Sequence, residues 1–366
     1  MITPIIGQGN ETGAAPGDAQ SRLLDSLRAA LREAASEFAQ VELELMPDKG
    51  LAHHHVRLLG TGCIARLPKQ SQMGLAAHAN LAYQAACFER ACASGHAPAL
   101  HGVLSPSAAL PRGGLLVEEI KGRAARLPGD LAAIAQGLAA IHSLDVPPGP
   151  RRAPLRAPPD GVAALCDEIE AQAVHLDAAR LAPRALAAID IALLRLRTAA
   201  RLLERAPPRL IAFDAHPGNF LICDDGRAVL VDLEKARYGE PPLDLAHATL
   251  YTSTTWDVDA YAELTHEQVA LGYVTWAQHF EAAELWRPWL LPLRSAMWLW
   301  AVTWCAKWKA LADAPAEAGG DGEDWSSAHS DEALVRHVRG RVECYLSADI
   351  VDAVGAELIA LEQLLA

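Results

Sequence analysis

The chain has 366 residues, 51% of them hydrophobic and 21% charged, which is the composition of a globular protein. Its formal net charge of −13 argues against nucleic acid as a partner, because phosphate backbones bind basic surfaces. No apolar run approaches the roughly 20 residues that span a bilayer, and residues 1–10 lack the features of a signal peptide, so we expect no membrane partner.

The first third of the chain predicts a sheet-rich lobe after a loose segment at residues 1–19. Apolar residues recur at helical spacing from Leu23 to Phe38, with Asp18 as a candidate N-cap. Strands are predicted at 41–46, at 55–66 (two strands divided at Gly60–Gly62) and at 114–120, and a helix at 76–93. This order favours an antiparallel sheet with one packed helix, in a lobe of residues 20–120.

The remaining residues, 121–366, predict a larger, mostly helical lobe. Asp130 stands at the N-cap position of a helix with one apolar face. A proline-rich loop is predicted at 145–161, amphipathic helices at 162–205, a strand pair at 220–232 and a flexible connection at 314–330. The expected fold class is α+β, with a small antiparallel sheet lobe followed by a helical lobe.

The stretch from Leu210 to Ala246 carries the chemistry. Asp214 precedes a turn, H-P-G, which Asn219 closes. Two short apolar strands joined by a D-G pair follow, and Asp232 stands at the end of the second strand. Because a hairpin of this length returns the chain near its start, these three side chains are expected to converge. Carboxylate and amide oxygens suit Mg²⁺ with bound phosphates.

The pattern D-x-x-x-x-N, followed after a short hairpin by an Asp, is that of protein kinases. The stretch resembles the aminoglycoside phosphotransferase family, relatives of choline and fructosamine kinases. That family typically has H-G-D-x-H-P-G-N, a hairpin, I-D-W/F and then D-L-A. This chain has A-F-D-A-H-P-G-N, V-D-L and P-P-L-D-L-A. The resemblance implies a protein-kinase-like two-lobed fold.

The resemblance also assigns roles within this stretch. It implies that Asp214 is the catalytic base and that Asn219 and Asp232 are metal ligands. Asp244 matches a buried Asp that bonds the backbone of the catalytic loop, and His216 matches a position that shapes the loop. The family's first His is Ala212 here. Because that His supports the metal-binding Asp in relatives, its absence favours weaker activity.

The resemblance places nucleotide contacts in the sheet lobe. Arg66, in the strand C-I-A-R-L-P, takes the place of the kinase lysine that anchors phosphate, although a surface arginine remains an alternative. Gln84 stands at the position of its usual glutamate partner. Gly50 lies in the turn that covers the phosphates. Glu119 and Ile120 would offer backbone groups to the edge of adenine.

Other features have a structural and a functional interpretation. Residues 53–55 are three histidines, but two histidines on one strand face without a third ligand rarely form a metal site. Trp300, Trp304 and Trp308 form a helical stripe, which is either a packed face or an aromatic wall for an apolar or cationic acceptor. His142 is expected to be a satisfied histidine at the end of a helix.

These observations predict a small-molecule kinase that uses Mg²⁺ and ATP or GTP to phosphorylate a hydroxyl group of an aminoglycoside-like, choline-like or sugar-like acceptor. A pseudokinase that binds nucleotide without turnover is the main alternative, favoured by Ala212 and Gln84. A metal-dependent hydrolase is a second alternative. The seven scattered cysteines, with no C-x-x-C pair, favour the cytoplasm. We expect a monomer or homodimer.

Overall fold

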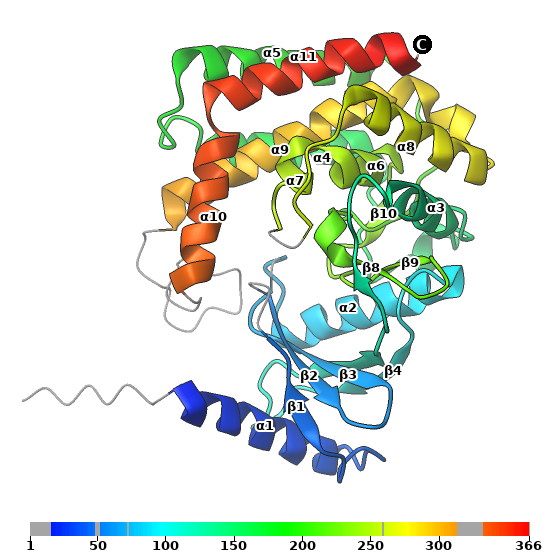
Figure 1. Ribbon diagram of the computed structural model, residues 1–366, viewed down its shortest axis with the longest axis vertical. Helices are drawn as coiled ribbons and strands as arrows, with labels where there is room; N and C mark the ends of the chain where they lie inside the picture. The colour runs from blue at the N-terminus through cyan, green and yellow to red at the C-terminus, as the bar shows by residue number, and fades with distance from the viewer. Residues whose placement is uncertain (1–15, 48–51, 72, 258–259, 313–331, 366) are drawn as a thin grey trace, which may run out of the picture.

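The computed structural model describes residues 16–47, 52–71, 73–257, 260–312 and 332–365. The chain folds into two lobes, a small one built on an antiparallel sheet and a larger one made mostly of helices (Figure 1). The predicted fold class is therefore confirmed. Among the described residues, no helix combines the length and the apolar character that crossing a membrane requires.

The small lobe contains a five-stranded sheet in the order β1-β2-β3-β5-β4. Its strands are β1 (Leu43–Leu45), β2 (His53–Leu58), β3 (Cys63–Pro68), β4 (Leu100–Leu104) and β5 (Gly114–Glu118). The sequence predicts all of them except β4. That edge strand alternates between half-buried and exposed residues before the buried Leu104 and is irregular at Gly102, so its apolar signal is weak.

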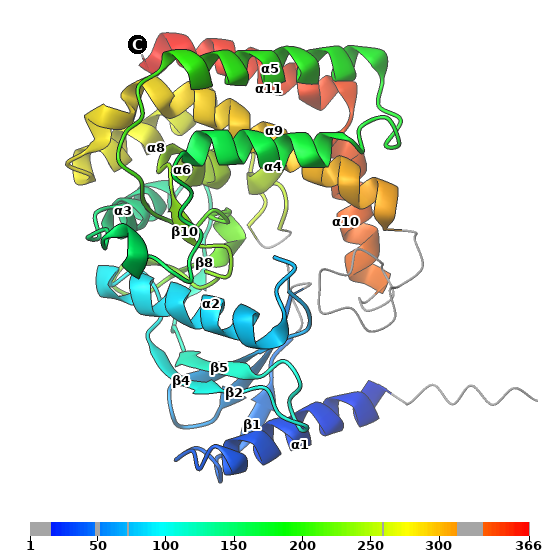
Figure 2. The ribbon, with the colours of Figure 1, turned by 180° about the vertical axis from the view of Figure 1, so that it is seen from behind.

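Alternation along the strands separates the two faces of this sheet. Ala65 and Leu67 of β3 and Leu116 of β5 pack in one cluster with α1 (Pro16–Glu33). Leu115 and Val117 pack in the other cluster with α2 (Ala77–Ala91), which lies between the sheet and the large lobe (Figures 1 and 2). The same period directs the side chain at position 66 toward the large lobe.

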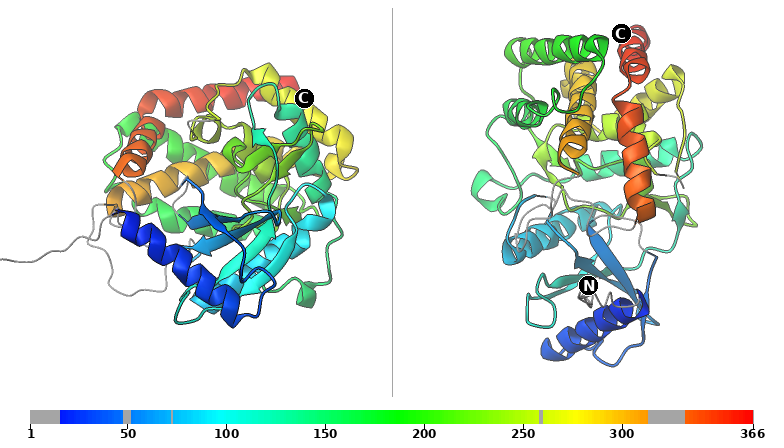
Figure 3. Two further views of the ribbon diagram at one scale, coloured as in Figure 1. Left: turned by 60° about the horizontal axis from the view of Figure 1, so that its bottom comes forward. Right: turned by 90° about the vertical axis from the view of Figure 1, so that its left-hand side faces the viewer.

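The large lobe is organised around α9 (Leu290–Leu311), which contacts α4, α5, α6, α10 and α11. The other helices are α3 (Leu131–His142), α4 (Gly161–Ala173), α5 (Pro183–Leu202), α6 (Pro242–Thr249), α7 (Tyr251–Thr254), α8 (His266–His279), α10 (Glu332–Tyr345) and α11 (Ala348–Leu365). Helices α5 and α11 lie side by side at the end far from the sheet, and α10 runs back toward the small lobe (Figures 1 and 3).

Short strands and turns connect these helices at the junction of the lobes. One small sheet has the order β6-β8-β9, and β7 pairs with β10. Their bounds are β6 (Arg123–Ala124), β7 (Arg209–Ile211), β8 (Phe220–Ile222), β9 (Ala228–Leu230) and β10 (Arg237–Gly239). Four 3-10 turns are described, η1 (Cys92–Ser94), η2 (Gly149–Arg151), η3 (Pro217–Asn219) and η4 (Ala283–Trp289). Gly226 takes a φ of 84° in the predicted β8–β9 hairpin turn.

Of the two predicted helix caps, Asp18 is wrong, and Asp130 is confirmed in position but does not cap the helix with its side chain. Helix α1 begins at Pro16, before Asp18, so Asp18 is not its N-cap. Asp130 does precede α3, but its carboxylate accepts hydrogen bonds from the Arg123 guanidinium and the Arg126 backbone instead of capping the helix. The connection predicted at 314–330 lies outside the described residues.

Candidate active site

Two antiparallel pairings bring the predicted catalytic segment together. Strand β7 leads into Asp214, and the hairpin β8–β9 leads into Asp232. The chain after Asp232 then returns as β10, which pairs with β7 so that Arg237 lies opposite Ile211. As a result, the segment that follows Asp232 runs beside the segment that precedes Asp214.

Asn219 links the two aspartates. Its side-chain Nδ2 donates to the backbone oxygen of Asp214 at 2.9 Å. Its own backbone oxygen accepts from the N–H of Val231, the residue before Asp232, also at 2.9 Å. Because Nδ2 is engaged, Oδ1 is the atom of this amide that can coordinate a cation. The predicted convergence of these residues therefore has a hydrogen-bonded basis.

Asp244 fixes the backbone of the loop that precedes Asp214. It is fully buried, and its carboxylate accepts from Ala212 N at 2.7 Å and from Phe213 N at 2.8 Å. His142 donates from Nε2 to the same carboxylate at 3.0 Å, while its Nδ1 accepts from the indole N–H of Trp276. The backbone contacts expected of Asp244 are present, and His142 is a satisfied buried histidine.

The residue before Asp214 adopts a backbone conformation that favours glycine. Phe213 has a φ of 59°, where the family pattern has Gly. Its buried ring packs edge-on against Trp300, with centroids 5.3 Å apart. The Arg237 guanidinium lies over the Phe213 ring, 3.6 Å from its centroid. Two bonded backbone groups and these ring contacts offset the strain. Phe213 is thus a second departure from the family pattern, besides Ala212.

A lysine that the sequence analysis overlooked contacts the predicted base. Lys235 Nζ donates to Asp214 Oδ2 at 2.8 Å, and the two side chains are only 17% and 16% exposed. His247 Nδ1 lies 3.7 Å from Asp214 Oδ1. Burial opposes ionisation of Asp214, but the positive charge of Lys235 and the neighbouring histidines hold its pKa below the ordinary value. The only sequence signal for this contact is a single lysine after D-L-E, which is too common a pattern to indicate a role.

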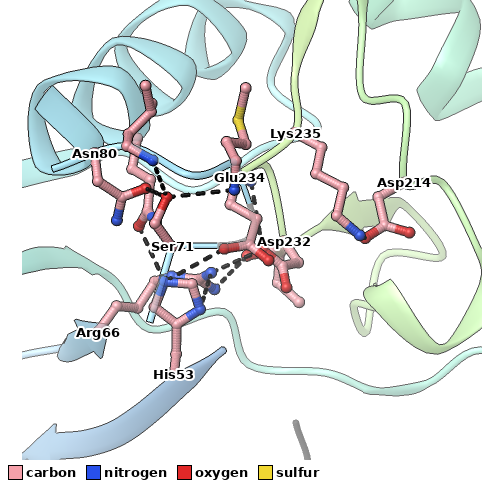
Figure 4. A network of polar contacts seen from close by, with 12 residues as sticks. His53, Arg66, Ser71, Asn80, Asp214, Asp232, Glu234 and Lys235 are labelled. Carbon is pink, nitrogen blue, oxygen red and sulfur yellow. Dashed lines mark hydrogen bonds and ion pairs between the residues drawn. The ribbon is translucent and has the colours of Figure 1, made fainter. Parts of the chain in front are cut away.

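Arg66 contacts the predicted metal ligand on the other side of the site (Figure 4). The Arg66 guanidinium donates to Asp232 Oδ1 at 2.8 Å and to Val231 O at 3.0 Å. It is 4% exposed, so the surface-arginine alternative is wrong. Burial opposes the charge of Asp232, but Arg66 more than offsets it and holds the pKa of that carboxyl well below its usual range.

Gln84 reaches Arg66 through a histidine instead of directly. Its Oε1 accepts from His53 Nε2 at 3.0 Å, and His53 Nδ1 faces an Arg66 nitrogen at 3.5 Å. Burial, reinforced by the charge of Arg66, lowers the pKa of His53 to about 3, so the ring is neutral and accepts from the guanidinium. Gln84, at the position of the usual glutamate partner, is therefore linked to Arg66 by a relay through His53.

His53 also lies beside two carboxylates. One ligand atom each from His53, Asp232 and Glu234 lie within 4.8 Å of one another, a spacing compatible with a metal ion. The third ligand that the histidine run lacks in sequence thus comes from a distant loop. Burial, together with the negative charge of Asp232, raises the pKa of Glu234 to about 8. Glu234 is consequently protonated at neutral pH, and Arg66 already neutralises Asp232.

Four predicted site residues remain, each with a different outcome. Gly50 lies outside the described residues. Glu119 donates its N–H to Gly62 O at 2.7 Å and its carboxylate binds Arg57, so its donor is not available to adenine. Ile120 is half-buried beside it. His216 packs edge-on against His247 within the loop, and its Nδ1 has no hydrogen-bond partner among the described residues.

The tryptophan stripe is a packed helix face that touches the site at one end. Trp304 packs against Trp256, and Trp308 is 8% exposed. Trp300 contacts Phe213 on one side, and the Lys235 ammonium lies 5.9 Å from its ring centroid. The stripe therefore supports the catalytic loop through Trp300, which contacts both Phe213 and Lys235.

A cavity of about 330 Å³ lies behind this loop, beside α4 and β10. Its lining includes Phe213, Arg237 and the buried Glu240. None of the residues predicted for catalysis or for metal binding lines it. It is therefore separate from the candidate active site, to which Phe213 connects it.

Comparisons with known proteins agree with this geometry. A model of the phosphotransferase enzyme family matches residues 44–286. No curated protein matches the chain in sequence.

Solved structures share the fold at low sequence identity. A choline/ethanolamine kinase family protein from Mesorhizobium loti is 18% identical with a TM-score of 0.59, over 93% of this chain and 99% of its own. Plasmodium vivax ethanolamine kinase is 11% identical with a TM-score of 0.56, over 92% and 96%. A thermostable mutant of aminoglycoside phosphotransferase APH(4)-Ia, in ternary complex with AMP-PNP and hygromycin B, is 18% identical with a TM-score of 0.54, over 88% and 99%.

Proposed function

The chain belongs to the phosphotransferase enzyme family, and from that membership we propose that it transfers the terminal phosphate of a magnesium-bound nucleotide to a hydroxyl group of a small molecule. The observation that carries the proposal is that Asn219 is hydrogen-bonded both to Asp214 and to the residue before Asp232. A proton acceptor and two oxygen donors on adjoining turns are the minimum set that this reaction requires.

Each residue then has a part in the mechanism. Asp214, kept ionised by Lys235, orients the acceptor hydroxyl and takes its proton as the oxygen attacks phosphorus. Arg66, fixed by its backbone and side-chain bonds, supplies a forked cation for the nucleotide phosphates. Asp244 keeps the backbone of the loop in place while the charge redistributes. Catalysis rests on positioning and on charge neutralisation.

The donor set fits Mg²⁺. The amide Oδ1 of Asn219 and the carboxylate of Asp232, whose side chain is 27% exposed, are hard oxygen ligands. These two residues would hold the ion, which when bound neutralises negative charge on the phosphates. The histidine–carboxylate group around Glu234 fits less well, because Glu234 is protonated at neutral pH.

ATP is the donor that we propose, with GTP as the alternative. Solved relatives of this fold contain ATP or AMP-PNP together with streptomycin or hygromycin B. In this chain the N–H of Glu119 is engaged, so its carbonyl oxygen and the backbone of Ile120 are the hinge groups that we propose for the adenine edge. We place the reaction in the cytoplasm, since all seven cysteines are free, in a monomer or homodimer.

A thermal-shift screen tests the proposal. Hydroxylated metabolites and antibiotics are added one at a time with Mg²⁺ and AMP-PNP, and the melting temperature is compared with that in either ligand alone. A shift that needs both ligands identifies the acceptor class. Acceptor-dependent ADP release, abolished in Asp214→Asn, then establishes transfer. Nucleotide binding without any turnover would instead establish the pseudokinase, and phosphate release without an acceptor would establish a hydrolase.

A further inference from the structure

The ion pair between Lys235 and Asp214 occupies the place where the reaction is proposed to occur. Figure 4 shows the Lys235 side chain extended toward Asp214, away from the cluster of His53 and Arg66. Lys235 also stands three positions after Asp232 in the chain. Its ammonium therefore lies between the proposed base and the segment of the proposed metal ligand. A phosphoryl group passing from a metal-bound nucleotide to the acceptor travels between those two residues.

Packing holds Lys235 in this position. Its ammonium lies 5.9 Å from the centroid of the Trp300 ring, which packs edge-on against Phe213. The guanidinium of Arg237 in turn lies over the ring of Phe213. This series of cations and rings anchors the lysine on the large lobe through α9. The contact with Asp214 is consequently built by side chains from several elements.

The resting contact also occupies one of the two oxygens of the proposed base. Lys235 engages Oδ2 of Asp214, and a hydroxyl proton must be taken up by a carboxylate oxygen. Both side chains are largely buried, so Lys235 leaves only when another anion takes the place of Asp214. The terminal phosphate of a nucleotide carries more negative charge than a carboxylate and offers several acceptor oxygens.

We propose that Lys235 is a catalytic residue that moves from Asp214 to the transferred phosphoryl group when the magnesium–nucleotide binds. This inference rests on the proposed function. In the step itself, the acceptor hydroxyl gives its proton to Asp214, and its oxygen forms a bond to the terminal phosphorus. The bond from that phosphorus to the leaving diphosphate oxygen breaks, and the electron pair stays on that oxygen. Lys235 remains protonated and neutralises the charge of the transferred group.

Binding of two nucleotides tests the movement without an acceptor. Dissociation constants for Mg²⁺–AMP-PNP and Mg²⁺–ADP are measured by titration calorimetry for the wild type, Lys235→Met, Lys235→Arg and the exposed control Lys309→Met. We expect Lys235→Met to weaken AMP-PNP about tenfold while ADP changes less than about twofold, since only AMP-PNP has a third phosphate. Lys235→Arg should retain most of the affinity, and Lys309→Met all of it.

Other results would overturn the inference. If Lys235→Met binds both nucleotides as the wild type does, the lysine is a permanent partner of Asp214. The double variant Asp214→Asn, Lys235→Met removes both charges, so it provides a folded form without the lysine if the single variant unfolds. The affinities of the double variant for AMP-PNP and ADP are then compared with those of Asp214→Asn alone, and the role of the lysine follows from the difference.

The outcome separates this inference from the proposed function. If the wild type binds neither nucleotide, both proposals fall. If the wild type phosphorylates an acceptor and Lys235→Met keeps its kcat, the proposed function stands and the role of Lys235 is wrong. If the role is correct, kcat falls about a hundredfold or more in Lys235→Met and is partly restored in Lys235→Arg.

Discussion

The two ends of the candidate site hold their charges differently. At the donor end, Arg66 is almost completely buried and is fixed by Val231, Asp232 and His53. At the acceptor end, Asp214 is 16% exposed and pairs with one lysine and, at a longer distance, one histidine. The donor end is a network in which the loss of one contact leaves others, whereas the acceptor end is a pair that a new anion can divide.

This difference in ion pairing suits the two ends to different functions. A network of several buried contacts keeps a cation in one geometry, which suits recognition of a phosphate that is always present in the bound nucleotide. An exchangeable pair suits a base that is needed only when the donor and the acceptor are both in place. Variants at the donor end should therefore change nucleotide affinity more than turnover, and variants of the base itself at the acceptor end should change turnover more than nucleotide affinity.

Asp214→Asn should have the largest effect and should act on turnover. Without a carboxylate to take the hydroxyl proton, kcat should fall about a thousandfold, in the range expected for loss of a general base. The dissociation constant for Mg²⁺–AMP-PNP should change little, as measured by calorimetry. Asp225→Asn, in the exposed hairpin turn, serves as the control and should leave kcat unchanged. A variant at position 214 with undiminished kcat would contradict the assignment of the base.

Arg66→Met should act mainly on affinity. It removes a phosphate donor and leaves the Asp232 carboxylate without its partner, so the dissociation constant for Mg²⁺–AMP-PNP should rise roughly ten- to a hundredfold. The melting temperature should fall as well, because the guanidinium is buried among several partners. Arg123→Met, which breaks an ion pair with Asp130 at the surface, is the matched control. Equal losses of affinity in both variants would remove the distinction between the ends.

The donor end was more accessible to sequence analysis than the acceptor end. Arg66 follows from strand period and from the family pattern, and Asp214, Asn219 and Asp232 follow from their spacing around a hairpin. The relay through His53 does not, because a neutral histidine between Gln84 and Arg66 depends on how β2 packs against α2 and β3. The position of Gln84 in the sequence indicates a partner of Arg66, and the tertiary structure places His53 between the two side chains.

At the acceptor end, the family pattern points to residues that this chain replaces. Ala212 and Phe213 stand where the pattern has His and Gly, so neither indicates its role by residue type. Lys235 has no distinctive periodicity or motif, and its contact with Asp214 depends on the return of β10 beside β7. The fold class was predictable because strand alternation and helical spacing extend over many residues. The edge strand β4 was not, because only Leu104 of its five residues is buried.

Substitutions at Phe213 measure how the acceptor end tolerates its strained backbone. Phe213→Ala keeps the unfavourable φ and loses the buried ring, so the free energy of unfolding should fall by about 3 kcal/mol. Phe213→Gly loses the same ring but relieves the strain, so it should be about 1 kcal/mol more stable than the alanine variant. Both values come from urea denaturation. An alanine variant as stable as the glycine variant would mean that the backbone at position 213 carries no strain.

The smallest expected effect is a pH dependence at the acceptor end. Burial, despite the nearby Asp214 charge, lowers the pKa of His247 from 6.5 to about 4, so the folded protein keeps this ring neutral where the unfolded chain protonates it. Between pH 6.5 and pH 4 the unfolded state binds the additional proton, and stability falls as the pH falls. His247→Gln should make that decline shallower, by an amount on the order of 1–2 kcal/mol across the window.

Urea denaturation at several pH values measures this slope for the wild type, His247→Gln and the exposed control His279→Gln, which should behave as the wild type does. A steeper or unchanged decline in His247→Gln would contradict the expected sign. The neutral ring also matters for the comparison between the two ends. A protonated His247 would compete with Lys235 for Asp214, so keeping the imidazole neutral leaves the lysine as the cation that a phosphate has to displace. The exchange at the acceptor end is thus confined to one ammonium group, whereas the guanidinium at the donor end stays bound to several acceptors.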